Sequence, residues 1–312
     1  MSGIPLLPSD PISFPEPCYA LDDPDGLLAA GGALTPDWLV EAYGLGIFPW
    51  FENDDGPIYW WCPAVRGVTV PGQMRITRSL AKRLRNGGFT VTFDRCFYDV
   101  IEACAKLRAT SVGTWITPRM RQAYRELHAT GVAHSVEVWS ENMLVGGLYG
   151  LSLGQMFFGE SMFAERPDAS KVAFYHLHQR LCAWDFSLID CQMMNPHLKT
   201  LGVKPMPREA FLSLLAKNDL SLSRLGTWDN REAPQKTECP SLALDQIKIS
   251  PWIFISLPHT RAHTWTEAML KHCLPTPGGS SPVAATNTSR TKGFVAVVGI
   301  CIAPAAIIAA PA

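Results

Sequence analysis

The sequence lacks several short motifs that mark common enzymes and metal-binding proteins. It contains no C-x-x-C or H-E-x-x-H pattern, and His176 and His178 are two residues apart, which points them away from each other on a helix. A metal site is therefore not expected. The sequence also has no G-x-x-x-x-G-K-[ST], which excludes a P-loop. Ser161, in GESMF, does not stand in a G-x-S-x-G context and is a poor candidate nucleophile.

Charged residues are sparse as well. They make up 18% of the chain against 47% hydrophobic residues, and the net charge is −1. This composition is typical of a soluble protein with a sizeable core. It argues against a general coating of basic surface, so nucleic-acid contact would need a local patch, and no DNA partner is expected.

The first residues lack the basic segment of a secretory signal peptide and are broken by several prolines. The nine cysteines form an odd set without a regular framework, which favours reduced thiols. We therefore expect a cytoplasmic protein.

The 312 residues are enough for two domains, or for one core plus an appendage. We divide the chain into a small N-terminal domain, an α/β domain and a C-terminal extension, at residues 1–65, 66–230 and 231–312. The extension is rich in Pro, Thr and Ser and shows no sustained periodicity. Its last residues, 293–312, are uncharged and about as long as a membrane span, but Pro304 interrupts them. An irregular extension without a catalytic role is favoured over a membrane anchor.

Residues typical of helix ends predict several helices. Thr35 fits an N-cap, Pro36 the first helical position and Gly44 the end of a short amphipathic helix. Further helices are expected at 77–86 and about 118–128.

The middle of the chain predicts a sheet with a βαβ unit. Strands are expected at 134–139, 144–154 and 155–160, followed by a helix over about 170–184 and a strand at 186–191. The strands that flank the helix should run parallel, joined by a right-handed crossover.

This unit brings three polar side chains together. Glu160 and Asp190 are predicted at the carboxyl ends of parallel strands, so both should lie at the same edge of the sheet. If the second strand stays extended, Gln192 shares a face with Asp190. A lone carboxylate in an apolar run is costly unless it is paired or functional, so these residues form a candidate site.

A basic segment lies upstream. Residues 75–85 contain no acid, and on a helix they present a stripe of cations. Such a stripe can follow phosphates and give salt-dependent binding, and a solvated helix face is the alternative. The cations concerned are Arg78, Lys82, Arg83 and Arg85.

Aromatic residues occur at chain breaks, in FPWF, YWW and GTWIT. With Leu148, Phe157 and Phe158 they could line a pocket for a large apolar side chain, although core packing is the alternative for each alone. A carboxylate pair, an amide, an apolar pocket and a basic helix together suit acyl transfer from an ester to an amine.

Taken in order, these segments resemble the leucyl/phenylalanyl-tRNA–protein transferase family. The resemblance covers roughly residues 24–212 and is carried by GLLAAGGALT, AYGLGIFPWF, YWWCPAVR, RSLAKRLR, GTWIT, HSVEVW, LVGGLYGLSLG, FFGESMF, ASK, LIDCQ and HLKTLGVKPMPR.

The resemblance implies an α/β (α+β) fold, with a small N-terminal domain on an acetyltransferase-like (GNAT-like) mixed-sheet domain. It implies transfer of Leu or Phe, less often Met, from aminoacyl-tRNA to the N-terminal Lys or Arg of acceptor proteins. The products would enter N-end-rule degradation. It implies no cofactor and no metal.

The resemblance also assigns roles to residues. Asp190 and Gln192 match the catalytic pair, in which Asp190 orients Gln192 against the attacking amine, and Glu160 matches an acid that engages substrate amino groups. The basic stripe Arg78, Lys82, Arg83 and Arg85 matches the tRNA-binding region. The aminoacyl side-chain pocket is matched by Trp50, Trp115, Leu148, Phe157 and Leu177.

The sequence departs from the family pattern at a few positions. Ala64-Val65 replaces Asp-Pro before Arg66, Cys62 replaces Ser, and Leu177 stands where Phe is frequent.

Two other functions fit the sequence less well. An acyl-CoA transferase is disfavoured because MFAERPDASK has no glycine and two acids, which makes a poor phosphate cradle. The second alternative is a catalytically silent tRNA-binding protein, or a tail-anchored protein of unrelated role. A silent protein is disfavoured because Glu160, Asp190 and Gln192 are all present.

Overall fold

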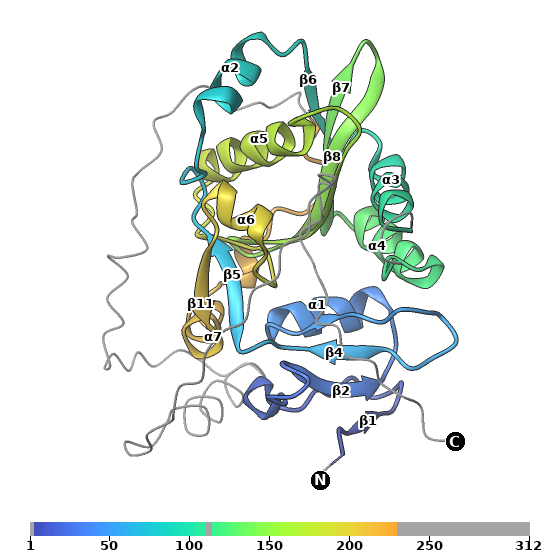
Figure 1. Ribbon diagram of the computed structural model, residues 1–312. Helices are drawn as coiled ribbons and strands as arrows, with labels where there is room; N and C mark the ends of the chain where they lie inside the picture. Colours follow the sequence, from blue (N-terminus) through green and yellow to red (C-terminus); the bar gives the residue numbers. More distant parts are fainter. Residues whose placement is uncertain (1–2, 110–113, 230–312) are drawn as a thin grey trace, which may run out of the picture.

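The computed structural model describes residues 3–109 and 114–229 (Figure 1). The predicted extension from residue 231, with its apolar end at 293–312, lies outside these residues. The prediction of an α/β protein with a mixed sheet is confirmed, because a small sheet near the N-terminus accompanies a larger mixed sheet.

The small sheet has four strands in the order β1-β2-β4-β3. Their bounds are β1 Leu6–Leu7, β2 Leu27–Gly31, β3 Phe48–Pro49 and β4 Tyr59–Trp61. Helix α1, Pro36–Gly44, follows β2, and its predicted start is confirmed because the Thr35 side chain accepts a hydrogen bond from the Trp38 amide. Phe14 packs edge-on against Trp38 and Trp60, with ring centroids 5.0 and 4.9 Å apart, which fills the space between helix and sheet.

The larger sheet has seven strands in the order β11-β5-β10-β9-β8-β7-β6. Among the described strands of this sheet, only β9 and β10 pair in parallel, and helix α5, Ala169–Ala183, connects them, so the predicted βαβ unit is confirmed. The strand bounds are β5 Val65–Thr69, β6 Thr90–Phe93, β7 Ala133–Ser140, β8 Met143–Leu153, β9 Met156–Ala164, β10 Leu188–Asp190 and β11 Lys204–Pro207.

Helices cover both faces of this sheet (Figure 1). Helices α3, Phe97–Ala109, and α4, Pro118–Ala129, lie on one face, here called the α3–α4 side. Helix α5 covers the other face, the α5 side, with α2, Arg78–Asn86, next to it. The remaining helices are α6, Pro196–Leu201, and α7, Arg208–Leu215.

Each side of the sheet has its own apolar cluster. The cluster on the α3–α4 side joins residues of both sheets, such as Trp60 and Phe158, with Tyr124 of α4. The cluster on the α5 side contains Phe157 and Phe174. Successive residues of β9 thus face opposite sides, as strand geometry requires.

A β-bulge interrupts this alternation in β9. Tyr149 of β8 pairs with Ser161, whereas the next residue, Gly150, pairs with Gly159, so Glu160 is the extra residue. Phe158 and Phe163 consequently lie in the same cluster although they are an odd number of residues apart. The prediction that β9 ends at Glu160 is therefore wrong, because the strand continues to Ala164.

The cysteines follow the prediction only in part. Cys182, on α5, is disulfide-bonded, which corrects the expectation of reduced thiols throughout. Among the described residues, Cys18, Cys62, Cys96, Cys104 and Cys191 carry thiols that form no disulfide. Within residues 3–109 and 114–229, no helix is long and apolar enough to cross a membrane.

Candidate active site

Glu160 lies at the bulge of β9 and is 1% exposed. Its Oε1 atom accepts hydrogen bonds from the Tyr43 hydroxyl at 2.5 Å and from the Gln192 amide nitrogen at 2.7 Å. The Tyr43 hydroxyl also lies 2.6 Å from the Tyr124 hydroxyl. The bulge thus turns a carboxylate of the central sheet toward donors from α1, α4 and the segment after β10.

Burial raises the pKa of Glu160 to about 7, and the negative charge of Asp190 adds to this effect, while hydrogen bonds from Tyr43, Tyr124 and Gln192 oppose it. Burial also raises the pKa values of Tyr43 and Tyr124 well above the ordinary range, so both remain hydroxyl donors at neutral pH. A carboxyl group with a pKa near neutrality can both accept and return a proton under physiological conditions.

Asp190 is the last residue of β10 and faces Arg66 of β5. The Nε of Arg66 donates to Asp190 Oδ1 at 3.2 Å, and its Nη2 donates to Oδ2. Both side chains are buried, so the charge of each compensates the desolvation of the other.

Arg66 also reaches the small sheet. Its Nη1 donates to the Gly46 carbonyl at 2.9 Å, and its guanidinium stacks between the rings of Phe48 and Phe211, at 5.0 and 4.5 Å from their centroids. One side chain thus fixes the orientation of Asp190 and joins it to the segment that follows α1.

Gln192 lies in a turn, so the extended strand on which its expected position depended does not reach it. Its φ is 58°, a left-handed conformation that L-residues rarely adopt, and β10 ends two residues earlier. Its backbone amide donates to Asp190 Oδ1 at 2.9 Å, while its side-chain nitrogen donates to Glu160. Asp190 therefore holds the backbone of Gln192, and the turn sends the amide side chain toward Glu160.

The three polar residues singled out from the sequence are thus brought together, although by a bulge and a turn. Sequence reasoning missed Tyr43 and Tyr124, and it named Arg66 only as the residue that follows the Ala64-Val65 departure from the family pattern. The signal for Tyr43 and Tyr124 was indirect: a buried acid needs donors, and both tyrosines lie on the buried faces of helices.

The five predicted aminoacyl-pocket residues fall into two groups. Leu148, Phe157 and Leu177 belong to the cluster on the α5 side. Trp115 belongs to the cluster on the α3–α4 side, and Trp50 packs against that cluster. The sheet separates the groups, so the five residues do not form one continuous lining.

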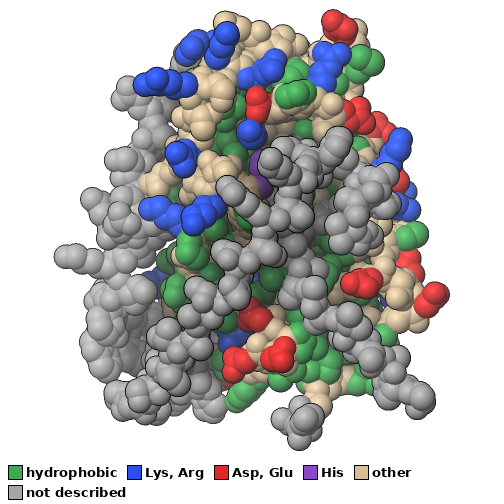
Figure 2. Space-filling model, viewed as in Figure 1, with side chains coloured by type: hydrophobic (Ala, Val, Ile, Leu, Met, Phe, Trp, Pro, Cys, Tyr) green, Lys and Arg blue, Asp and Glu red, His purple; other side chains and the backbone are tan. Residues whose placement is uncertain are grey.

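The predicted basic stripe lies on α2, which begins at Arg78 after an N-cap at Thr77. Arg78, Lys82 and Arg85 are exposed. The Arg83 guanidinium is half-buried and lies 5.8 Å from the centre of the Phe89 ring. Figure 2 shows Lys and Arg side chains gathered at the end of the molecule where Figure 1 places α2.

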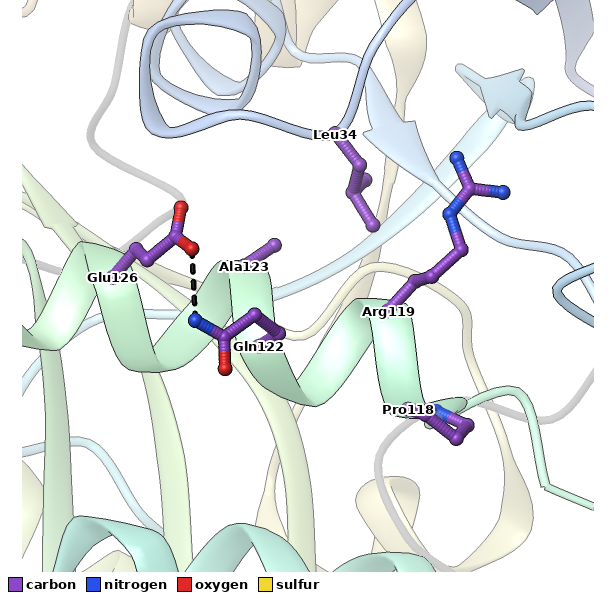
Figure 3. A pocket seen from close by; sticks show the side chains of 6 residues that line it. All are labelled: Leu34, Pro118, Arg119, Gln122, Ala123 and Glu126. Atoms are coloured by element: carbon purple, nitrogen blue, oxygen red, sulfur yellow. Dashed lines mark hydrogen bonds between the residues drawn. The ribbon is translucent and has the colours of Figure 1, made fainter.

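A shallow cavity of about 380 Å³ lies elsewhere, between α4 and the loop before α1 (Figure 3). None of the predicted site residues lines it; its walls are Leu34, Pro118, Arg119, Gln122, Ala123 and Glu126. In the described part of the chain, no cluster of His, Cys, Asp or Glu has the composition of a metal site.

The two-sheet fold and the buried carboxylate–amide cluster identify an α/β protein with a candidate enzyme site. Sequence comparisons identify its family. A family model described as "Leucyl/phenylalanyl-tRNA protein transferase" matches residues 68–216, and the model of the N-terminal domain of the same family matches residues 32–64.

Curated relatives agree with the family models. The chain is 56% identical over 212 residues to the leucyl/phenylalanyl-tRNA--protein transferase of Chromohalobacter salexigens, covering 68% of this chain and 82% of the relative. It is 52% identical over 232 residues to the protein of the same name from Aromatoleum aromaticum, covering 74% and 97%. The chain therefore belongs to the leucyl/phenylalanyl-tRNA–protein transferase family of aminoacyltransferases.

Proposed function

We propose that this protein transfers Leu or Phe, and less readily Met, from aminoacyl-tRNA to the N-terminal Lys or Arg of acceptor proteins. The observation that carries the proposal is the contact of the Gln192 amide with a buried Glu160 whose pKa is near 7. The modified proteins would be substrates of N-end-rule degradation in the cytoplasm. Kinship of the larger domain with acetyltransferases is part of the same proposal.

The reaction exchanges an ester for an amide. The neutral amine of the acceptor attacks the ester carbonyl of the aminoacyl-tRNA, forming a C–N bond. Glu160, as a carboxylate, takes the proton that the amine nitrogen loses. As the C–O bond breaks, this proton passes to the departing ribose oxygen, so Glu160 returns to its starting state.

Gln192 positions the attacking amine. Because its nitrogen donates to Glu160, its carbonyl oxygen is the end of the amide that can accept an N–H of the amine. Asp190 acts indirectly: its carboxylate accepts a hydrogen bond from the backbone amide of Gln192 and so holds the turn in place. Holding both groups rigidly reduces the entropic cost of the reacting geometry.

The remaining predicted residues bind the donor. We assign Leu148, Phe157 and Leu177 to the apolar lining that receives the aminoacyl side chain, because all three lie in one cluster that also contains Ile189 of β10. Trp50 and Trp115, on the other side of the sheet, would contact a different part of the donor. The stripe on α2 would contact tRNA phosphates.

The proposal is tested with purified protein, labelled Leu-tRNA and two peptides that differ only in N-terminal Arg or Glu. Label should enter the Arg peptide alone. Label in neither peptide would refute the transferase proposal, and equal labelling would refute the acceptor specificity.

A variant separates chemistry from binding. In the folded fraction of the protein, Asp190→Ala should lower the transfer rate while the affinity for tRNA stays within about twofold, since Asp190 is not part of the α2 stripe. A full transfer rate in this variant would refute the role of Asp190.

A further inference from the structure

We propose that Trp228 is a positioning residue that sets the preference among aminoacyl side chains by limiting the space available to Phe157. This inference rests on the proposed function. Trp228 lies beyond residues 68–216, the part of the chain that the transferase model matches.

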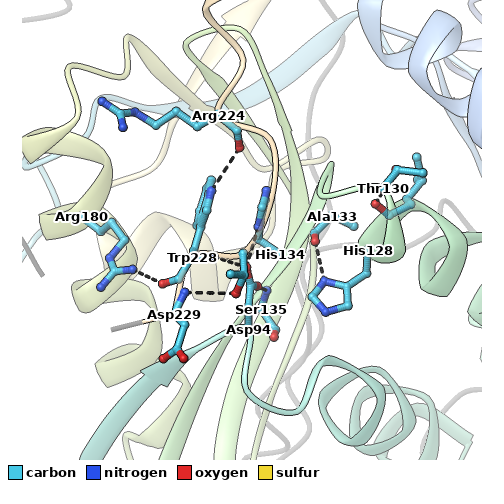
Figure 4. A network of polar contacts seen from close by, with 12 residues as sticks. Asp94, His128, Thr130, Ala133, His134, Ser135, Arg180, Arg224, Trp228 and Asp229 are labelled. Atoms are coloured by element: carbon cyan, nitrogen blue, oxygen red, sulfur yellow. Dashed lines mark hydrogen bonds and ion pairs between the residues drawn. The ribbon is translucent and has the colours of Figure 1, made fainter. Parts of the chain in front are cut away.

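The backbone around Trp228 is fixed to the larger sheet (Figure 4). Its amide donates to Asp94 Oδ2 at 2.7 Å, and its carbonyl accepts from Arg180 Nη1 on α5. Nearby, the Gly226 amide donates to the Gly131 carbonyl at 3.2 Å. The segment is thus held by residues that precede β7, follow β6 and lie on α5.

Asp94 is the centre of this attachment. Besides Trp228, it accepts hydrogen bonds from the Ser135 amide and from His134 Nδ1, both at 2.8 Å. Burial lowers the pKa of His134, which keeps the ring neutral at physiological pH. A neutral His134 that donates from Nδ1 to Asp94 presents a flat ring in a fixed orientation.

The indole of Trp228 lies on that ring. The centroids of Trp228 and His134 are 3.7 Å apart, and the ring planes differ by 8°. The Trp228 indole also contacts Phe157, with ring centroids 5.9 Å apart, and is 3% exposed. Trp184 and Phe186 surround it at 5.1 and 6.2 Å.

A glycine of the neighbouring strand β8 lies directly against the Phe157 ring. His134, Gly150 and Gly159 are register neighbours across β7, β8 and β9. A Cβ atom at Gly150 would lie 2.7 Å from the Phe157 ring, so this ring rests directly on the glycine backbone. Phe157 therefore cannot move toward the sheet, and Trp228 limits its movement on another side.

The size of residue 228 should therefore determine how far Phe157 can yield to a bound side chain. Phe157 shares its cluster with Leu148 and Leu177, which we assign to the same lining. A smaller residue at position 228 leaves space behind Phe157 and favours a phenylalanyl over a leucyl group. Because protein interiors are tightly packed, a change in side-chain volume at position 228 alters the space available to Phe157.

The test uses the full chain with Trp228→Leu and Trp228→Phe. Trp139→Leu is the matched control, because Trp139 lies on β7 like His134 but donates its Nε1 to Thr92 Oγ1 at 2.7 Å. For each protein, kcat/KM is measured with Phe-tRNA and with Leu-tRNA, using one acceptor peptide with N-terminal Arg. Thermal melting reports whether each variant is folded.

The Phe-to-Leu ratio of kcat/KM should rise about three- to tenfold in Trp228→Leu, which is the scale of a changed apolar pocket. It should rise less in Trp228→Phe and stay unchanged in Trp139→Leu. If Trp228→Leu does not fold, Trp228→Phe still decides the question by the direction of its ratio.

An equal fall of both rates in the Trp228 variants would overturn the inference and leave a purely structural role. A wild-type protein that uses neither aminoacyl-tRNA would instead refute the proposed function, so the two failures are distinguishable.

Discussion

Glu160 and Asp190 are both buried, but their surroundings give them different chemistry. Asp190 faces the guanidinium of Arg66, whereas Glu160 is hydrogen-bonded by the neutral groups of Tyr43 and Gln192. Neutral donors compensate the burial of a carboxylate less fully than a cation does. The pKa of Glu160 therefore rises to about 7, as a proton acceptor at neutral pH requires.

The raised pKa makes protein stability depend on pH. Because the folded pKa of Glu160, about 7, exceeds its ordinary value of 4.5, the native state binds the proton more tightly than the unfolded state. The contribution of Glu160 to the free energy of unfolding is thus greatest below pH 4.5 and is lost as the pH rises through 7. The total change is about 3 kcal/mol.

The variant Glu160→Gln isolates this effect. Urea unfolding of wild type and variant between pH 4 and pH 8 should show the wild type losing stability relative to the variant, by about 3 kcal/mol. A constant difference across that range would contradict the raised pKa.

At the scale of single elements, the sequence predicted most of the larger sheet. Strands β7 to β9 and helix α5 were expected, because their apolar alternation and their turns are local signals. The bulge at Glu160 and the left-handed turn at Gln192 were not expected. The bulge arises from the pairing of β9 with β8. The turn is held by two backbone hydrogen bonds: the Gly67 amide donates to the Gln192 carbonyl, and the Cys191 amide donates to the Gly67 carbonyl. Such pairings are non-local, so a single segment cannot reveal them.

The contact between β5 and β10 depends on one buried ion pair. Arg66→Leu should lower the free energy of unfolding by about 3–5 kcal/mol, because it leaves Asp190 buried without its cation. The double variant Arg66→Leu/Asp190→Leu should recover part of this loss. Chemical denaturation of the three proteins measures the coupling.

Arg121→Ala provides the control for that cycle. Arg121 lies 3.2 Å from Glu102, and its side chain is 26% exposed, so its loss should cost less than about 1 kcal/mol. Equal losses for Arg66→Leu and Arg121→Ala would contradict the importance of the buried pair.

Helix α2 carries a separate prediction. Arg78→Ala/Lys82→Ala should weaken tRNA binding and reduce the slope of log affinity against log salt by roughly 1.4 to 1.8, since two phosphate contacts are lost. Filter binding at several salt concentrations measures both quantities.

Arg121→Ala/Arg125→Ala on α4 removes the same charge from a different helix and should leave the slope unchanged. The stripe would lose its assigned role if both double variants had the same effect.

At the scale of the whole molecule, the site joins segments far apart in sequence. Tyr43 comes from α1, Arg66 from β5 and Tyr124 from α4, and all converge on the β9–β10 region. The sequence could indicate Glu160, Asp190 and Gln192 because one βαβ unit carries them. It could not indicate the other three as their partners, since only packing of α1, α4 and β5 around that unit brings them into contact.

The central claim is that Glu160 accepts the proton of the attacking amine. The most direct measurement is the single-turnover rate of leucyl transfer to a peptide with N-terminal Arg, followed from pH 5.5 to pH 8.5 in wild type and Glu160→Gln. The transfer rate of the wild type should fall as the pH drops below an apparent pKa of about 7. The variant should be slower by a factor of about 10² or more. Its remaining pH dependence should come only from protonation of the attacking amine. An unchanged rate, or the same limb near pH 7 in the variant, would contradict the account.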